Sequence, residues 1–133
     1  IYRRVPVRIL GSAHTPPQPY AVAAKMEQLL AEYETQKTQS NIIEKIAEFH
    51  LRFEGIHPFI DGNGRTGRLI MNLELLKHGY LPIDIKYADK QRYYDCFDEY
   101  CSGANSAKAM VDLITEYEIA ELKNRIAIIE SIN

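Results

Sequence analysis

The stretch from residue 65 to residue 78 constrains the fold of this chain most strongly, because it has almost no polar face. Its apolar side chains are Leu69, Ile70, Met71, Leu73, Leu75 and Leu76. A helix that is apolar on all sides is normally buried, so this pattern predicts the central helix of a helical domain. Lys77 and His78 suit the negative C-terminal end of such a helix. Gly79 is the expected C-cap, and Pro82 prevents the helix from continuing.

Apolar residues at helical spacing predict four further helices. The first covers about residues 20 to 34, and the second runs from an N-cap at Ser40 to the vicinity of Gly55. Two more cover about residues 89 to 101 and 106 to 129, separated by a Ser-Gly-Ala-Asn stretch that breaks a helix. The apolar stripes of the first two helices are formed by Val22, Met26, Leu29, Tyr33, Ile42, Ile46, Phe49 and Phe53.

Residues 2 to 15 follow a different pattern, in which apolar residues alternate with others before a Gly-Ser pair. This alternation predicts a short strand and a turn, and Pro6 restricts the strand to an edge. A chain of 133 residues favours a single domain. We therefore expect a mainly all-α fold: one helical bundle with a small β element near its start.

Composition excludes several classes of protein. Hydrophobic residues make up 46% and charged residues 26%, which is typical of a globular domain. The net charge of −2 argues against direct binding to nucleic acid or to an anionic membrane. Cys96 and Cys101 are five apart in an expected helix, so we expect reduced thiols and a cytoplasmic protein. The chain starts at Ile1 without an initiator Met, so we expect a core excised from a longer chain.

Chemically active residues are concentrated between residues 57 and 68. Gly62 and Gly64 allow the backbone to approach a ligand closely, and the free N–H groups of the helix that follows form an anion site. Arg65 and Arg68 are three residues apart in the first turn, so both can contact different oxygens of one polyphosphate.

Two further residues of this stretch complete a site for a magnesium-nucleotide. Asp61 supplies a hard oxygen ligand beside the anion site, as Mg²⁺ requires when it bridges two phosphates. His57 has the only nearby side chain whose ordinary pKa is close to neutrality, so it is the candidate general base for a substrate hydroxyl.

Each feature alone also has a purely structural interpretation, because a Gly-Asn-Gly turn connects helices and Asp61 can cap one. However, the positive end of the helix dipole disfavours an arginine at a helix N-terminus by up to ~1 kcal/mol. Two arginines at this place therefore indicate a bound anion that offsets the cost. A zinc or iron site is the other alternative, with the ligands His50, Glu54, His57 and Asp61. Its spacing does not fit the common metal motifs. We assign no catalytic role to His14 or His78.

The stretch HPFIDGNGRTGR resembles the signature of the Fic (Fido) family, H-x-F-x-D/E-G-N-G-R-x-x-R, and meets every fixed position. The resemblance extends to residues 7–17, which are similar to the family's flap and its following Pro-Pro, and covers nearly the whole chain. It implies a single Fic core over residues 1–133, with a β-hairpin flap at about 3–15. It also implies a protein adenylyltransferase (AMPylator), which transfers AMP from ATP to a Ser, Thr or Tyr hydroxyl of a target protein.

The resemblance also implies a role for each matching residue. His57 would deprotonate the target hydroxyl, Asp61 would hold Mg²⁺, and Arg68 would bind the γ-phosphate. The anion hole for the α- and β-phosphates would consist of Gly62, Asn63, Gly64 and Arg65. The adenine pocket would be lined by Tyr93, Tyr94 and Phe97. The target would dock by strand addition on a flap made of Val7, Arg8, Ile9, Leu10 and Gly11.

This sequence departs from the family pattern at two places. Cys101 stands where the relatives have an adenine-site Asn, which implies relaxed base selectivity. Residues 40–44 match only the first part of the family's inhibitory motif, with Lys45 following, so we expect any inhibitory helix or antitoxin to lie outside this chain.

Other activities of the same site stay open. The phosphate-binding residues alone also suit a kinase-like orientation of ATP, in which the γ-phosphate is transferred. The Gly-Asn-Gly sequence of the motif favours AMP transfer. Removal of AMP from a modified target, self-modification and a non-catalytic nucleotide-sensing role are further alternatives.

Overall fold

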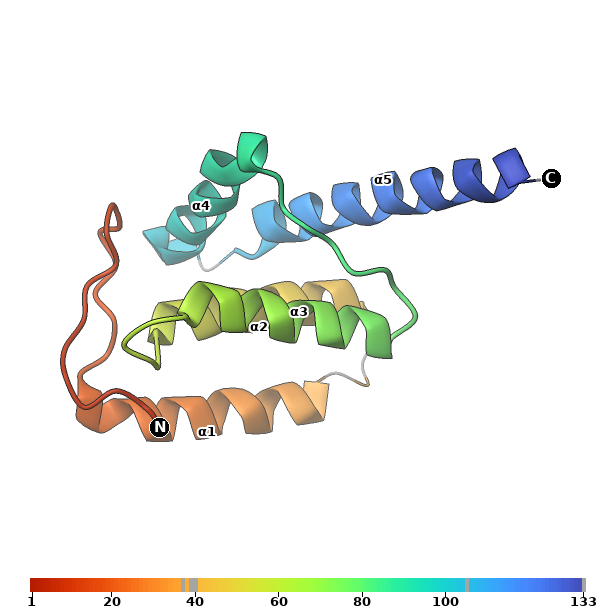
Figure 1. The fold of residues 1–133 in the computed structure, drawn as a ribbon. Helices are drawn as coiled ribbons and strands as arrows, with labels where there is room; N and C mark the ends of the chain where they lie inside the picture. The colour runs from red at the N-terminus through yellow and green to blue at the C-terminus, as the bar shows by residue number, and fades with distance from the viewer. Residues whose placement is uncertain (37, 39–40, 105, 133) are drawn as a thin grey trace.

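The computed structural model describes residues 1–36, 38, 41–104 and 106–132, and its regular elements are helices. Figure 1 shows their order along the chain. The elements are α1 (Pro19–Gln36), α2 (Ile42–Ile56), α3 (Asn63–Lys77), η1 (Tyr87–Asp89), α4 (Lys90–Glu99), η2 (Tyr100–Ala104) and α5 (Lys108–Ile132). The α-helices thus follow the predicted pattern within a few residues, and the expected mainly helical fold is confirmed.

Helix α2 forms the centre of the bundle, in contact with α1, α3 and α5. Its buried residues are Ile46, Ala47, Phe49, His50, Leu51, Phe53 and Ile56. In Figure 1, α1 lies on one side of the α2–α3 pair, and α4 and α5 lie on the other. The Tyr33 hydroxyl of α1 donates to Glu74 Oε2 of α3 at 2.8 Å, which joins α1 directly to α3.

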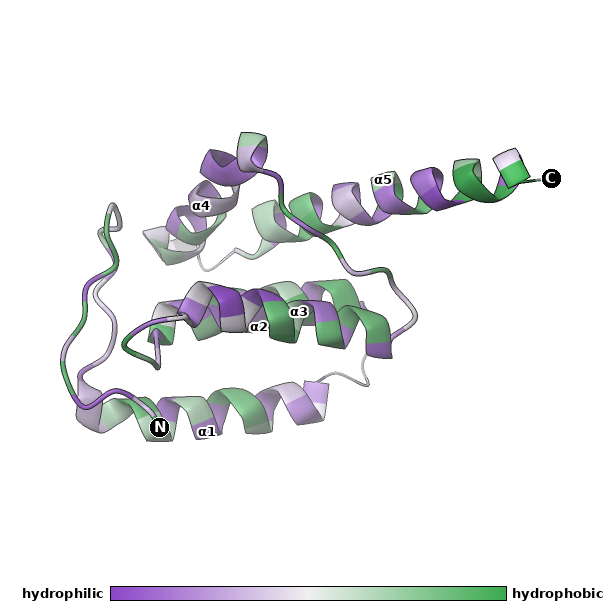
Figure 2. Ribbon diagram, viewed as in Figure 1, coloured by the Kyte–Doolittle hydropathy of each residue, from purple (hydrophilic) through white to green (hydrophobic). Residues whose placement is uncertain are grey.

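The prediction that residues 65 to 78 form the central, fully buried helix is wrong. Helix α3 buries Met71 and Leu75, but Leu69, Leu73 and Leu76 are exposed by 71, 49 and 55%. Only the side of α3 that faces its neighbours is covered, so the apolar pattern overstates its burial. The apolar pattern overstates the burial of helix α5 as well, because its buried residues Met110, Leu113 and Ile114 lie near its start. Figure 2 shows that its projecting half carries further hydrophobic residues.

The expected β-hairpin flap is not formed as a pair of strands. Residues 3–15 instead make two extended arms joined by a turn, drawn in red in Figure 1, and no strand occurs within the described part of the chain. The turn itself is confirmed, since the Ser12 N–H donates to the Ile9 carbonyl at 3.2 Å and Gly11 has a φ of 77°. Pro6 has no N–H to donate, which weakens pairing between the arms.

Several helix ends differ from their predicted positions. The predicted N-cap Ser40 lies outside the described residues, and Asn41 caps α2 by accepting from the Glu44 N–H. Helix α3 begins at Asn63, with Gly62 as N-cap, and it ends with His78 rather than Gly79 as C-cap. The predicted break after residue 101 occurs within η2, at Gly103, which has a φ of 99°. No helix described here is long and apolar enough to cross a membrane.

Candidate functional site

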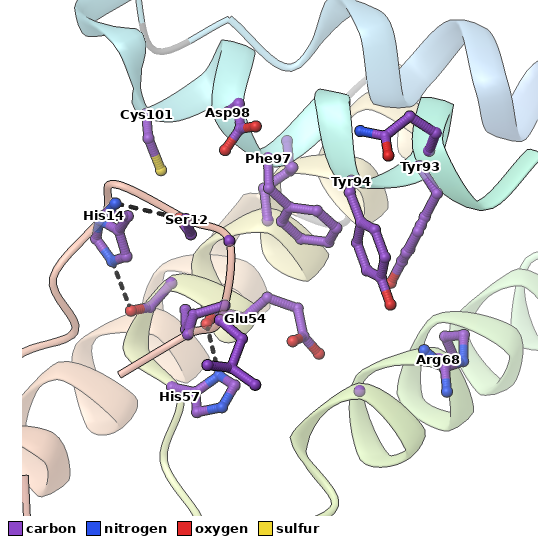
Figure 3. Close-up of a pocket in the computed structure, with 17 residues that line it drawn as sticks. Ser12, His14, Glu54, His57, Arg68, Tyr93, Tyr94, Phe97, Asp98 and Cys101 are labelled. Carbon is purple, nitrogen blue, oxygen red and sulfur yellow. Dashed lines mark hydrogen bonds between the residues drawn. The ribbon is translucent and has the colours of Figure 1, made fainter. Parts of the chain in front are cut away.

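A pocket of about 430 Å³ opens where the N-terminal arms, α2, α3 and α4 meet. Figure 3 shows its lining side chains. Nine of the predicted site residues line it: Ile9, Leu10, Gly11, His57, Gly64, Arg68, Tyr93, Tyr94 and Phe97. Segments far apart in the sequence therefore bring the predicted base, one predicted phosphate-binding arginine and the aromatic residues to a single cavity.

His57 is held at the C-terminal end of α2, where it is the C-cap with a φ of 51°. Its backbone N–H donates to the Phe53 carbonyl at 3.0 Å, and its Nδ1 lies 3.3 Å from the Glu54 carbonyl. A carbonyl only accepts, so this contact assigns the proton to Nδ1 and leaves the lone pair on Nε2. Burial, with smaller contributions from Arg3 and His14, lowers the pKa of His57 below its ordinary value. The imidazole is therefore neutral at pH 7 and able to accept a proton.

The loop before α3 is held by a buried amide. Asn63 Oδ1 accepts from the Phe59 N–H, and Asn63 Nδ2 donates to the Phe59 carbonyl, both at 2.8 Å. The N-cap Gly62, with a φ of 81°, has no side chain to satisfy the first N–H groups of α3. These N–H groups and the helix dipole are therefore free to bind an anion. The side chain of Asn63 is occupied with the loop, so only its backbone is free for a ligand.

The two arginines of the motif lie in different surroundings. The Arg68 guanidinium lies along Gly64, where an added Cβ would be 3.1 Å from Nη1, and it lines the pocket. The Arg65 side chain is 75% exposed and pairs with Asp61, whose side chain is 91% exposed, at 3.4 Å. Asp61 lines a separate, more open hollow beside the N-terminal residues. The pocket lining thus does not include Asp61, Gly62, Asn63 or Arg65, nor Val7 or Arg8.

A buried polar cluster under the pocket was not predicted from the sequence. Glu54 lines the pocket, its Oε1 is buried without a hydrogen-bond partner, and burial raises its pKa to about 7. His50 is bonded through Nε2 to the Tyr93 hydroxyl at 2.6 Å, and burial lowers its pKa to about 4. Gly67 is required here, because an added Cβ would overlap Glu54 Oε1 and lie 3.1 Å from the His50 ring.

The signal that could have revealed this cluster is the spacing of His50 and Glu54, four residues apart on one helix face. The sequence alone suggests His50 and Glu54 only as ligands of the alternative zinc or iron site. In the structure, His50 is hydrogen-bonded to Tyr93 instead. The described residues contain no group of three or more His, Cys, Asp or Glu side chains that could hold a metal ion.

The aromatic wall of the pocket comes from α4. Tyr93 is buried, with its ring 5.0 Å from Phe97 in an edge-to-face arrangement, whereas Tyr94 is half exposed. Tyr94 and Phe97 therefore have more ring surface available to a ligand than Tyr93 has. Asp98 and the free thiol of Cys101 also line the pocket.

Comparison with known proteins is consistent with this geometry. Residues 1–75 match the model of the Fic/DOC family. The chain belongs to the Fic/DOC family. The matched residues include the N-terminal arms, α1, α2 and most of α3, and so both the flap-like residues 7–17 and the stretch 57–68 that carry the Fic resemblance.

Individual Fic relatives agree with the family match. The chain is 40% identical over 96 residues to "Protein adenylyltransferase Fic" of Drosophila grimshawi, covering 70% of this chain and 19% of that protein. It is 34% identical over 103 residues to a probable protein adenylyltransferase of Aquifex aeolicus, covering 77% of this chain and 31% of the relative. The chain therefore spans less than a third of the length of either curated relative.

Solved Fic structures share the fold. A Fic domain containing signaling protein from Bacteroides thetaiotaomicron superimposes with a TM-score of 0.80 at 28% identity, covering 92% of this chain and 52% of that one. The correspondence extends over most of the chain, beyond the residues matched by the family model.

Proposed function

We propose that this chain is the catalytic core of a protein adenylyltransferase, which transfers AMP from ATP to a Ser, Thr or Tyr hydroxyl of a target protein. The observation that carries the proposal is the pocket that joins His57 to Arg68 and to the aromatic wall of α4. Membership of the Fic/DOC family and the names of the two curated relatives support it. A cytoplasmic location, expected from the free thiols, belongs to the same proposal.

In the proposed reaction, His57 accepts the proton of the target hydroxyl at Nε2. The hydroxyl oxygen then forms a bond to the α-phosphorus of ATP, and the bond between that phosphorus and the bridging oxygen breaks. AMP stays on the target, and diphosphate leaves. His57 is suited to this step because its Nδ1 faces the Glu54 carbonyl and its lowered pKa keeps it unprotonated at neutral pH.

Phosphate binding is assigned to the start of α3. The N–H groups that follow Gly62 and the guanidinium of Arg68 would contact the phosphates, with Arg65 in support from the outer side. The adenine ring would lie against Tyr94 and Phe97, with Tyr93 behind them. Rate acceleration then comes mainly from positioning and from positive charge placed around the phosphate groups.

Asp61 is suited to help hold Mg²⁺, because its exposed carboxylate has only a 3.4 Å contact with Arg65. Mg²⁺ is commonly bound by one or two carboxylates together with substrate phosphates, so a single Asp beside the anion site fits. When bound, Mg²⁺ would neutralise part of the phosphate charge.

The N-terminal arms are the proposed docking site for the target protein. Val7, Arg8 and Ile9 lie outside any strand pairing among the described residues, and Leu10 and Gly11 form the turn that follows, with Leu10 98% exposed. Extended backbone of this kind can accept a strand of a partner, which brings the target hydroxyl to the mouth of the pocket. Another copy of this chain can serve as target in self-modification, and an inhibitory helix or antitoxin is expected outside this chain.

The test is to incubate the chain with Mg²⁺ and ATP labelled separately at the α- and γ-phosphate, and to look for labelled protein in a lysate. The proposal predicts transfer of α-label that disappears in His57→Ala. Transfer of γ-label would mean a kinase-like orientation, and release of AMP from a pre-modified target would mean the reverse reaction. ATP binding without either outcome would favour the nucleotide-sensing role.

A further inference from the structure

Five successive carbonyl groups, in the last turn of α2 and in the two residues that follow it, each face a donor outside the helical pattern. Glu54 O faces His57 Nδ1, Gly55 O accepts from His14, and Ile56 O and His57 O accept from the Arg3 guanidinium. Pro58 O accepts from the Arg3 backbone N–H at 2.9 Å. The last carbonyls of a helix have no partner within it, so these contacts complete the end of α2. All but one come from the N-terminal segment.

Arg3 makes most of these contacts although it is a buried cation. It is only 3% exposed, and its guanidinium donates to four carbonyls, those of His57 at 2.7 Å, Ile56 at 3.2 Å, Pro17 at 2.6 Å and Val5 at 3.1 Å. Burial of a charge is costly unless its hydrogen bonds are satisfied, and the planar, multiply donating guanidinium is suited to satisfy several at once. Arg3 therefore connects the start of the N-terminal arms to His57, the predicted general base.

His14 makes a second tie, from the returning arm. Its Nε2 lies 2.8 Å from the Gly55 carbonyl, and Figure 3 shows this bond beside the contact between His57 and Glu54. Because a carbonyl only accepts, His14 donates from Nε2. His14 and Arg3 thus bind adjacent carbonyls at the C-terminal end of α2, those of Gly55 and Ile56, and each of the two residues comes from a different arm.

We propose that Arg3 and His14 are positioning residues that clamp the end of α2 to the N-terminal arms and so fix the position of the His57 imidazole. The inference rests on the proposed function, since it takes His57 as the base. It adds that the arms which would dock the target and the loop that carries the base are held as one unit. A displacement of about 1 Å in a reacting group can cost ~100-fold in rate, so such a clamp matters for catalysis.

The test uses nuclear magnetic resonance of the histidine side-chain nitrogens, which reports the tautomer and the pKa of His57 without any reaction. Its variants are Arg3→Gln, Arg3→Lys, His14→Ala and His14→Gln. Arg4→Ala is the matched control, because Arg4 is an exposed neighbour of Arg3. ATP binding, transfer of α-label and thermal unfolding are measured on the same samples.

We expect His57 in Arg3→Gln and His14→Ala to lose the preference for a proton on Nδ1, with its pKa moving up toward the ordinary value. The charged or titratable groups near it are Arg3 and His14 on the arms, Glu54 on α2 and Arg68 across the pocket. Arg3→Lys keeps the charge but loses the forked contacts, so it should retain the pKa and lose transfer. The variant His14→Gln keeps a donor and should recover much of the wild-type behaviour.

For transfer, Arg3→Gln should lower the rate by ~10- to 100-fold with ATP binding changed less than about threefold, because the clamp acts on the base rather than on the phosphates. A folded Arg3→Gln or His14→Ala whose His57 tautomer and pKa equal those of Arg4→Ala would overturn the clamp. If Arg3→Gln fails to fold, His14→Ala decides alone. If the His57 resonances change in Arg3→Gln or His14→Ala but the wild-type chain transfers no AMP, the inference of a clamp is supported and the proposed function is rejected.

Discussion

At the scale of single residues, the site depends on close contacts that the sequence pattern shows only in part. The spacing of residues 57 to 68 predicts a base and an anion site, and the structure brings His57, Gly64 and Arg68 to one pocket. Gly67 occupies a variable position of the motif, yet Glu54 and His50 leave no room there for a Cβ. Helix α2 brings Glu54 and His50 together with α3, and this proximity depends on tertiary packing that periodicity alone cannot supply.

The buried carboxyl of Glu54 predicts a pH-dependent stability. Its folded-state pKa is raised to about 7, so between about pH 4.5 and 7 the unfolded chain loses this proton while the folded chain keeps it. Stability should therefore fall as pH rises through this range, and Glu54→Gln should remove that fall. We expect the variant to be more stable than wild type at pH 8 by up to ~3 kcal/mol, and the difference to shrink at pH 4.5.

Urea unfolding at the two pH values measures this difference. His50 has the opposite dependence, because its pKa is lowered to about 4, but both proteins contain it and its contribution largely cancels in the comparison. An equal difference at pH 4.5 and pH 8 would show that the pKa of Glu54 is not raised in the folded chain.

At the scale of elements, helical periodicity was sufficient to locate the helices but not their neighbours. Apolar spacing predicted α1 and α2 closely, whereas α3 keeps Leu69, Leu73 and Leu76 on its exposed side. Composition cannot show which side of a helix is covered, because that depends on the elements packed against it. The arms of residues 3–15 illustrate the same limit, since alternation predicts an extended backbone but strand pairing needs a partner in register.

The loop between α2 and α3 should depend on the buried amide of Asn63. In Asn63→Ala both bonds to the Phe59 backbone are lost, and we expect a loss of ~1–3 kcal/mol in the free energy of unfolding. Asn124→Ala is the matched control, because Asn124 is exposed on the projecting half of α5 and should change stability by less than about 0.5 kcal/mol. Chemical denaturation of both variants measures the difference; equal effects would show that the amide does not hold the loop.

At the scale of the whole molecule, the bundle and the pocket are completed before the end of α5. The buried residues of this helix are Met110, Leu113 and Ile114, and its last fixed side-chain contacts to other elements include those of Tyr117 and Glu118. The Glu118 carboxylate accepts from the Leu81 N–H at 2.8 Å, which secures the connection that follows α3. Beyond these residues, α5 extends away from the bundle.

Removal of residues 121–133 should therefore leave the fold intact. We expect the melting temperature to change by less than about 3 °C, because the deleted residues are mostly exposed and include exposed isoleucines. Thermal unfolding followed by circular dichroism tests this. As a control, a longer deletion from residue 113, which removes Leu113 and Ile114, should abolish cooperative unfolding. A large loss of stability in the shorter deletion would mean that the projecting half of α5 packs against the bundle.

The central claim is that His57 acts as the general base whereas Arg68 binds the phosphates of ATP. Paired measurements of ATP binding and AMP transfer test this claim most directly. We expect His57→Ala to bind ATP within about threefold of wild type and to lose transfer by ~100-fold or more, because it removes only the base. Arg68→Ala should weaken ATP binding by ~10-fold or more, because it removes charge-assisted bonds to phosphate. AMP transfer by His57→Ala at the wild-type rate would contradict the account.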